Sequence, residues 1–381
     1  NIMSWGCNGG SGGQAWYDLD IAVDPFDADV VFAGGVNCFK SINGGQTWSI
    51  SSHWWGDCGV PAVHADLHVM EYNPINWTLY AGNDGGIYYT TDQGTSWILI
   101  SNGLVISQVY KIGQSATMRD KVLNGYQDNG TSTYMGDYWE FTRGGDGMEC
   151  AVDHQNPAYS YATVYYGNID RYLNNSYDAD VASNGNFGLD ESGAWVTPFI
   201  LDEYDASIMF LGYENVWRCD NVNGPSWQIQ WEKISDFTTG SKMRVLEQSP
   251  ANPNILFAAN YGDRLFRTEN AYDDDANFVE LTSYLPANAG INDIECHPED
   301  ENVLYISHNF KVWKSEDKGL TWEDISGTLP SVAFTSIAFY ERSHDGLYLS
   351  SDIGVYYKDA FMDDWMMFSS GLPVDASIQE I

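Results

Sequence analysis

Several carboxylates in this sequence stand between glycines in short turns, a setting that allows close approach of a ligand. Asp84 lies in Asn-Asp-Gly-Gly, Asp128 in Gln-Asp-Asn-Gly and Asp146 in Gly-Gly-Asp-Gly. Two carboxylates that face one cleft can hydrolyse a glycoside, one as general acid and the other as base or nucleophile. The three aspartates are therefore candidate catalytic residues. The alternative is that each one only caps its own turn.

The segment His64-Ala-Asp-Leu-His68 places two imidazoles and a carboxylate at alternate positions. In a β-strand these three side chains share one face, and together they are suitable ligands for a transition metal. His64, Asp66 and His68 are therefore candidates for ligand or metal binding. We favour a competing interpretation, a hydrogen-bonded network buried between sheets, because most buried polar groups are simply satisfied.

A repeated motif indicates the elements that must position these residues. Three segments share the pattern Ser/Thr-x-Asp/Asn-x-Gly-x-Thr/Ser-Trp, and they are Ser41–Trp48, Thr90–Trp97 and Ser315–Trp322. The Asp or Asn side chain can accept hydrogen bonds from N–H groups of its own turn. The glycine can supply a positive φ angle, and the tryptophan can pack between adjacent sheets. This boxed turn therefore has a structural role, and it is expected to join the third and fourth strands of each unit.

Alignment on the boxed turns reveals eight copies of a β-rich unit, spaced roughly 40–50 residues apart, which is the period of four-stranded propeller blades. The expected units start near residues 16, 62, 106, 147, 196, 242, 290 and 333. We therefore predict an all-β fold in which residues 1–381 form a single β-propeller of four-stranded antiparallel blades. Eight blades are expected, with seven as the alternative.

Strand direction separates the loops of a propeller into two faces. The turn from second to third strand and the link to the next blade share one face, which we call the loop face, and the boxed turns lie on the other. One polar position per unit is expected on the loop face, namely Asn37, Asp84, Asp128, Asn168, Glu214, Asp263, Asn309 and Asp352. The links 54–63 and 143–148 add Trp54, Trp55 and Arg143 as candidate ligand-binding residues, and Tyr126, Tyr134, Tyr213 and Tyr261 are further aromatic candidates.

The charge balance excludes some partners. The chain has 17 basic and 53 acidic residues and a formal net charge of −36, which repels nucleic acids and anionic membrane surfaces. No apolar run is long enough to cross a bilayer, so membrane insertion is not expected. The acidic excess suits solubility, a salty extracellular setting or Ca²⁺ binding by carboxylates. No other cofactor is indicated.

The six cysteines contain no Cys-x-x-Cys pair, which disfavours a zinc or thioredoxin-type site. Cys7, Cys38 and Cys58 lie near one another in glycine-rich sequence, so one disulfide among them is expected if the protein is secreted. Cys150 and Cys296 lie in strand patterns and are interpreted as small buried side chains.

The sequence resembles the Asp-box, or BNR-repeat, β-propellers, which include sialidases, tandem-propeller xyloglucan-cleaving glycosidases and the sortilin ectodomain. It is most similar to secreted BNR-repeat proteins of Bacteroidetes, many of which are exported by the type IX system. Besides the boxed turns, the segments that carry the resemblance are Trp16–Pro25, His64–His68, Gly82–Ile87, Gly125–Thr131 and Gly144–Gly147. The resemblance implies a propeller outside the cell, and no single activity.

Three functions are consistent with these features. The first is a secreted or cell-surface propeller that binds polysaccharide or a surface protein through its acidic loop face. The second is a glycoside hydrolase or lyase, although a sialidase would need an arginine cluster and arginine is scarce. The third is a structural module of a large extracellular assembly. Residues 376–381 are expected to begin another unit, so the chain is expected to be a piece of a longer secreted protein.

Overall fold

The computed structural model describes residues 2–104, 106–286, 290–308, 310–374 and 376–381. Within these residues the chain forms eight four-stranded sheets, each an antiparallel meander of consecutive strands. The other regular elements described are three short 3₁₀ turns, namely η1 (Tyr165–Gly167), η2 (Ser226–Gln228) and η3 (Thr282–Tyr284). None of these helical turns has the length or apolar character to span a membrane. The prediction of eight four-stranded antiparallel blades is confirmed.

The chain divides into two compact units, residues 1–107 and 108–381, which are described separately. The first unit holds two sheets. They are β1 (Asp20–Val23), β2 (Val31–Gly34), β3 (Cys38–Ser41) and β4 (Ser49–Ser52), then β5 (Leu67–Tyr72), β6 (Leu79–Asn83), β7 (Gly86–Thr90) and β8 (Ile98–Leu99).

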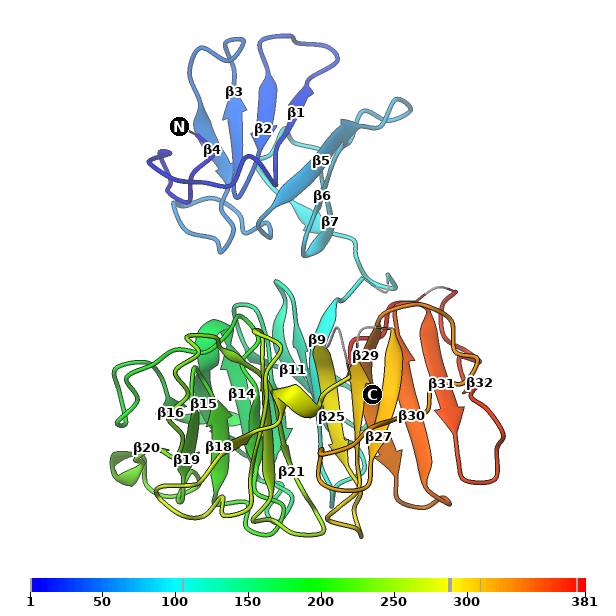
Figure 1. Ribbon diagram of the computed structural model, residues 1–381. Helices are drawn as coiled ribbons and strands as arrows, with labels where there is room; N and C mark the ends of the chain where they lie inside the picture. Colours follow the sequence, from blue (N-terminus) through cyan, green and yellow to red (C-terminus); the bar gives the residue numbers. More distant parts are fainter. Residues whose placement is uncertain (1, 105, 287–289, 309, 375) are drawn as a thin grey trace. The chain divides into compact units, whose positions relative to one another are not determined.

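The second unit holds six sheets, which stand side by side in Figure 1. The first sheet consists of β9 (Val109–Gln114), β10 (Lys121–Tyr126), β11 (Gly130–Met135) and β12 (Trp139–Arg143). The second consists of β13 (Cys150–Val152), β14 (Tyr159–Val164), β15 (Asn168–Leu173) and β16 (Ser176–Ala182). The third consists of β17 (Phe199–Leu201), β18 (Met209–Gly212), β19 (Val216–Cys219) and β20 (Glu232–Lys233). The others are β21 (Met243–Gln248), β22 (Leu256–Asn260), β23 (Leu265–Thr268) and β24 (Val279–Glu280); β25 (Ile291–Cys296), β26 (Leu304–His308), β27 (Lys311–Ser315) and β28 (Glu323–Asp324); and β29 (Phe334–Tyr340), β30 (Gly346–Ser351), β31 (Gly354–Lys358) and β32 (Met366–Met367).

The expected start of each repeat unit lies one to five residues before the first strand of a sheet. Residues 376–381 are an exception to the expected pattern, because the described part of this tail is not a strand. Instead, Ile378 N donates to the Ser351 carbonyl at 3.0 Å. Membership of all eight sheets in one propeller remains a prediction.

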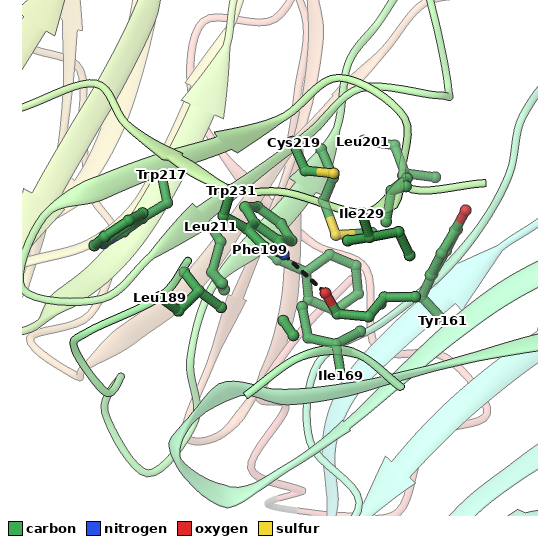
Figure 2. Packing of buried hydrophobic residues seen from close by; sticks show 14 of the residues in the cluster. Tyr161, Ile169, Leu189, Phe199, Leu201, Leu211, Trp217, Cys219, Ile229 and Trp231 are labelled. Carbon is green, nitrogen blue, oxygen red and sulfur yellow. Dashed lines mark hydrogen bonds between the residues drawn. The ribbon is translucent and has the colours of Figure 1, made fainter. Parts of the chain in front are cut away.

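Apolar side chains fill the spaces between successive sheets. Figure 2 shows the cluster between the β13–β16 and β17–β20 sheets, where Trp231 packs among Phe199, Leu211 and Cys219. The indole Nε1 of Trp231 donates to the Val181 carbonyl at 2.8 Å, so this buried tryptophan also hydrogen-bonds the preceding sheet. Because blade faces are covered by their neighbours, each blade depends on the next for its stability.

The boxed turns join third and fourth strands, as expected. Asp317 Oδ1 accepts from Thr321 N at 2.7 Å and from Leu320 N at 3.0 Å, while its Oδ2 accepts from the Thr321 hydroxyl at 2.7 Å. Asn43 and Asp92 accept the equivalent backbone bonds in the other two copies. The prediction of local turn chemistry is therefore confirmed.

The boxed tryptophans differ in their packing. Trp97 packs on the apolar cluster between the β1–β4 and β5–β8 sheets, and Trp322 packs on the cluster between the β21–β24 and β25–β28 sheets. Trp48 is half-buried and donates to the Gly45 carbonyl of its own turn. The predicted packing between sheets is confirmed for Trp97 and Trp322.

A fourth box was missed because its loop is longer. Thr268 donates to Asn270 Oδ1 at 2.7 Å, and the same oxygen accepts from Asn277 N at 2.9 Å. Phe278 then occupies the tryptophan position and packs on the cluster between the β17–β20 and β21–β24 sheets. The insertion moves the acceptor and donor seven residues apart, which the eight-residue pattern does not match.

The first strands of several sheets in the second unit meet at one cavity. Side chains of β9, β17, β21, β25 and β29, together with Glu149 just before β13, line one cavity of about 240 Å³. Inside it, a carboxylate on one first strand accepts an N–H from the next first strand. Asp293 and Glu295 of β25 accept from Ile337 N at 3.0 Å and Phe339 N at 2.9 Å.

The same interaction recurs at other sheet boundaries. Glu247 of β21 accepts from Cys296 N at 3.0 Å. The tail residue Glu380 accepts from Ile112 N of β9 at 2.5 Å and from the Lys111 ammonium at 2.8 Å. For β25 and β29, the acceptor comes from the first strand of the preceding sheet. For β9, the C-terminal tail provides it. We call these contacts carboxyl latches.

Burial changes the protonation of these groups. It raises the pKa of Glu149 to about 8, although Lys111 opposes the shift. It also raises the pKa of Glu295 to about 8 against the hydrogen bond from Phe339, and it raises the pKa of Glu247 well above its usual range. Burial disfavours the charge of Lys111, but Glu149 and Glu380 outweigh it and raise the pKa of this ammonium.

The box geometry predicts a stability loss in Asp317→Ala, which removes acceptors for two backbone N–H groups. The expected cost is about 1–3 kcal/mol in the free energy of unfolding, measured by urea denaturation. Asp317→Asn should cost less, because Asn43 holds the same position in the first box. Glu316→Ala is the control, since this neighbour is exposed and its ion pair within the described residues is with Lys314 on the surface. Equal losses in the Asp317 and Glu316 variants would contradict the assigned role.

The carboxyl groups in this cavity predict that the free energy of unfolding falls as pH rises from about 5 to 8. The unfolded chain releases the Glu295 proton near 4.5, whereas the folded protein retains it to about 8. The folded state therefore binds more protons within this window, and deprotonation favours unfolding. Urea midpoints measured at intervals across the window should decline, and Glu295→Gln should flatten the decline. The exposed Glu299→Gln serves as the control and should leave the slope unchanged; an unchanged slope in Glu295→Gln would refute the assignment.

Candidate functional site

The meander brings the expected loop-face residues to second-to-third strand turns. Asn37, Asp84, Asp128, Glu214, Asp263 and Asp352 lie in these turns, and Asn168 begins β15 directly after one. Asn309 lies outside the described residues. Each unit therefore gathers its predicted polar positions at one end of its sheets. Their exposure differs, because Asn37 is buried whereas Asp263 and Asp352 are exposed.

Aromatic rings cluster on the loop face of the first unit. Trp54 and Trp55 stack with ring centroids 4.8 Å apart and an interplanar angle of 17°, and Trp5 meets Trp54 edge-on at 6.0 Å. Trp55 is 69% exposed and Trp5 is 48% exposed. We call these three residues the tryptophan cluster. Rings with open faces suit stacking on flat apolar surfaces such as those of sugars.

Two constraints hold the tryptophan cluster. Asn37 donates to the Trp5 carbonyl at 3.2 Å and accepts from Trp54 N at 2.9 Å, so this buried amide connects both segments. The disulfide Cys7–Cys58 joins the same segments covalently. Asn37, predicted as a ligand-binding residue, therefore acts as a positioning residue. The predicted single disulfide among Cys7, Cys38 and Cys58 is confirmed, and Cys38 is buried and unpaired.

The expected strand face of His64, Asp66 and His68 does not form. His64 and Asp66 precede β5, which begins at Leu67, and Asp66 has a left-handed backbone with φ of 66°. Asn83 donates to the His64 carbonyl at 3.1 Å, and a side chain at Gly85 would collide with the His64 ring. These contacts with the β6–β7 turn hold the segment out of the strand. The three side chains therefore do not align as predicted.

The structure instead gathers carboxylates with His68. The His68 Nε2 lies 2.7 Å from Asp84 Oδ1, and the Tyr17 hydroxyl donates to Asp84 Oδ2 at 3.1 Å. The Tyr17 ring meets the His68 ring edge-on at 4.9 Å. Asp66 accepts from Gln14 Nε2 at 2.6 Å. Asp84, predicted as a catalytic candidate, is thus a fixed acceptor between an imidazole and a phenol.

A second aromatic cluster lies on the loop face of the second unit. Tyr165 and Trp195 stack with centroids 5.2 Å apart at 19°, and Tyr166 meets Trp195 edge-on at 5.6 Å. Tyr166 has a left-handed backbone with φ of 67°, which is strained for a residue with a side chain. Reciprocal bonds join Tyr166 to the loop that carries Trp195. We call these three residues the tyrosine–tryptophan cluster, and their exposures lie between 37% and 47%.

Two of the candidate aspartates approach this cluster. Asp146 Oδ1 accepts from Asp128 N at 2.8 Å, so Asp146 caps the turn that carries Asp128. The adjacent Gly145 has φ of 85°, and a side chain there would come within 4.0 Å of the Tyr165 ring. The Trp195 indole donates to the Tyr110 hydroxyl at 3.3 Å. The second unit therefore places both aspartates beside stacked aromatic rings.

Other predicted site residues have structural contacts. Arg143 pairs with Asp170 at 2.6 Å, and its side chain is only 17% exposed, so it is held within the fold. Burial raises the pKa of Asp170, and the Arg143 guanidinium partly offsets this. Tyr213 is fully buried and donates to the Gly167 carbonyl, which contradicts its expected exposure. Tyr134 hydrogen-bonds Gly136 in the β11–β12 turn, at the opposite end of the sheet from the expected one.

Five other predicted site residues have no described contact with either aromatic cluster. These residues are Tyr126, Glu214, Asp263, Tyr261 and Asp352. Tyr261 is 53% exposed, with the Arg244 guanidinium 5.4 Å from its ring centroid. Asp352 accepts from the Ser377 hydroxyl of the tail at 3.3 Å. Tyr126 accepts from Asn124 at 3.2 Å within β10. The predicted uniform ring of ligand-binding groups thus resolves into two aromatic clusters.

Sequence reasoning missed Trp5, Tyr165, Tyr166 and Trp195. Trp5 precedes the first recognisable unit, and Trp195 lies in an irregular link between sheets. A signal was present for Tyr165 and Tyr166, which stand directly before Asn168 in a turn that was assigned to the loop face. Adjacent aromatic residues in a turn lack neighbours that would bury both rings.

One of the comparisons with known proteins supports the fold. Neither a protein-family model nor a curated protein sequence matches this chain. A chain in the crystal structure of the mitotic checkpoint complex has a TM-score of 0.53 and 10% identity, covering 71% of this chain and 79% of that chain. The GH74 xyloglucanase from Xanthomonas campestris has a TM-score of 0.30 and 13% identity, covering 94% of this chain and 65% of that chain. With its eight antiparallel sheets, the chain belongs to the β-propeller class.

The tryptophan cluster predicts a specific response to reduction of the disulfide. The sequence separation of Cys7 and Cys58 is 51 residues, and loss of such a cross-link should destabilise the first unit by about 2–4 kcal/mol. The double variant Cys7→Ser with Cys58→Ser should unfold at a lower temperature and show altered tryptophan fluorescence below that transition. Reductant added to the double variant is the control and should have no further effect on this region, and fluorescence unchanged in the double variant would show that the disulfide does not hold the cluster.

Proposed function

We propose that this chain is a secreted or cell-surface propeller that binds polysaccharide through its loop face. The observation that carries the proposal is the pair of exposed aromatic clusters, each with a stacked pair of rings. Sugar rings present apolar C–H faces that stack on such aromatics. The disulfide supports an oxidising compartment outside the cytoplasm.

Polar groups beside the rings suit sugar hydroxyls. In the second unit, Asp146 and Asp128 lie at a turn next to Tyr165, and carboxylates are strong acceptors for hydroxyl donors. Lys242 lies 5.5 Å from the Tyr166 ring centroid and donates to the Gly193 carbonyl, which braces the cluster from its other side. An aromatic face bordered by fixed polar groups is the general design of a small-ligand site.

The finer classification is also part of this proposal. The hydrogen-bonding of the boxed turns supports membership of the Asp-box, or BNR-repeat, propellers. We further propose a relation to the secreted Bacteroidetes proteins of that group and export by the type IX system, on the sequence segments that resemble them. A cell-surface protein is the alternative ligand, and a structural role in a large extracellular assembly is the alternative function.

The candidate aspartates offer less support for a glycosidase. Asp146 is engaged as a turn cap and Asp84 is bonded to His68 and Tyr17, so each has a structural explanation. An enzyme would release new reducing ends from the polysaccharide that it binds, and Asp146→Asn would abolish that release. Binding without release supports the lectin-like function.

Glycan-array screening of the full chain, followed by calorimetry with the strongest ligand, tests the proposal. Trp195→Ala and Trp55→Ala each remove one stacking surface. The variant in the cluster that binds the glycan should weaken glycan binding roughly tenfold or more, which corresponds to about 1.4 kcal/mol of binding free energy.

Trp227→Ala is the matched control for both variants. Trp227 is 82% exposed but lies in η2 between β19 and β20, on the face opposite the loop face. Its removal should leave affinity unchanged. Absence of binding across the array, or equal loss in all three variants, would refute a loop-face polysaccharide site.

A further inference from the structure

The first unit carries a buried carboxyl group, that of Asp18, which pairs with no lysine or arginine among the described residues. Asp18 is fully buried, and neither of its carboxylate oxygens has a hydrogen-bond partner within the part of the chain that the structure describes. Lys40 is the only lysine or arginine among residues 1–107, and its ammonium donates to the Gln93 carbonyl at 2.9 Å. Burying a charge without a partner is strongly unfavourable, so a buried acid normally acquires a counter-charge or a proton.

Two further carboxylates, those of Asp66 and Asp84, lie in the same part of the first unit. Asp66 is only 8% exposed and interacts directly with Asp18. A carboxylate oxygen of Asp66 lies within 4.8 Å of one from Asp84. We propose that Asp18, Asp66 and Asp84 form a Ca²⁺ site in the first unit.

Local structure supports a built site. The turn from Gln14 to Asp18 is closed by N–H groups of Tyr17 and Asp18 that donate to the Gln14 carbonyl, and the Gln14 side chain then bonds Asp66. Asp66 has a left-handed backbone with φ of 66°, a conformation that residues with a side chain adopt at some cost. A bound cation at the Asp66 carboxylate would offset that cost.

The donor set favours Ca²⁺ over other metals. Carboxylate oxygens are hard ligands, and Ca²⁺ tolerates the irregular geometry that separate turns provide, whereas Mg²⁺ demands near-ideal octahedral coordination. His68 already bonds Asp84 and would orient this carboxylate from outside the coordination sphere.

Calorimetric titration of CaCl₂ into the EDTA-treated full chain, with excess Mg²⁺ as competitor, tests the proposal. One saturable site is expected, with a Ca²⁺-dependent rise of roughly 5–10 °C in the unfolding temperature of the first unit. Asp18→Asn should abolish the Ca²⁺ response and, in EDTA, unfold at a higher temperature than the natural chain, because the buried charge is gone.

Glu71→Gln is the matched control, since it removes one exposed carboxylate from β5 of the same unit. It should bind Ca²⁺ unchanged. If Asp18→Asn fails to fold, Asp66→Asn provides the second test and should likewise lose the response. Weak binding that Glu71→Gln reduces equally would indicate diffuse screening and overturn the site. Absence of any saturable Ca²⁺ response in the full chain would also overturn it.

Discussion

The second unit depends on how the edge N–H groups of its first strands are satisfied. A first strand pairs with only one neighbour in its own sheet, so alternate N–H groups along its other edge lack a ladder partner. The carboxyl latches provide the acceptors from the adjacent sheet, and Asp293 with Glu295 meets Ile337 with Phe339 at matching two-residue spacing. A single side chain therefore both satisfies an edge donor and sets the register between blades. Apolar clusters supply most of the burial, but they do not specify register so closely.

Features that depend on contacts between residues close in sequence were predicted correctly, whereas features that depend on residues far apart in sequence were not. The boxed turn was predicted residue by residue because Asp317 bonds to atoms only three and four positions away. The strand face of His64, Asp66 and His68 was predicted wrongly because contacts with Asn83 and Gly85, about twenty residues on, decide where β5 begins. The eight sheets followed from a period that depends on composition and turns. The latches were not predicted, because alternating Asp293 and Glu295 resemble the solvent-facing side of an ordinary strand.

The candidate site shows the same division. Trp54 and Trp55 were selected from an inter-blade link and form an exposed stacked pair. Their supports, Asn37 and the disulfide, come from segments distant in sequence, so the position of the rings was not evident. Trp195 contacts Tyr165 and Tyr166 through an irregular loop without a recognisable motif. A ring of equivalent positions was predicted from the repeat, whereas the exposed stacked rings come from two links between sheets, from the segment before β1 and from the turn between β14 and β15.

Buried carboxyls also alter how the molecule behaves in an electric field. A formal charge of −36 assumes that every acid is ionised at pH 7. Glu149 and Glu295, whose pKa values are raised by burial to about 8, instead retain protons at neutrality. Native electrophoretic mobility should consequently be lower than composition implies, and unfolding should release protons and increase the negative charge of the chain.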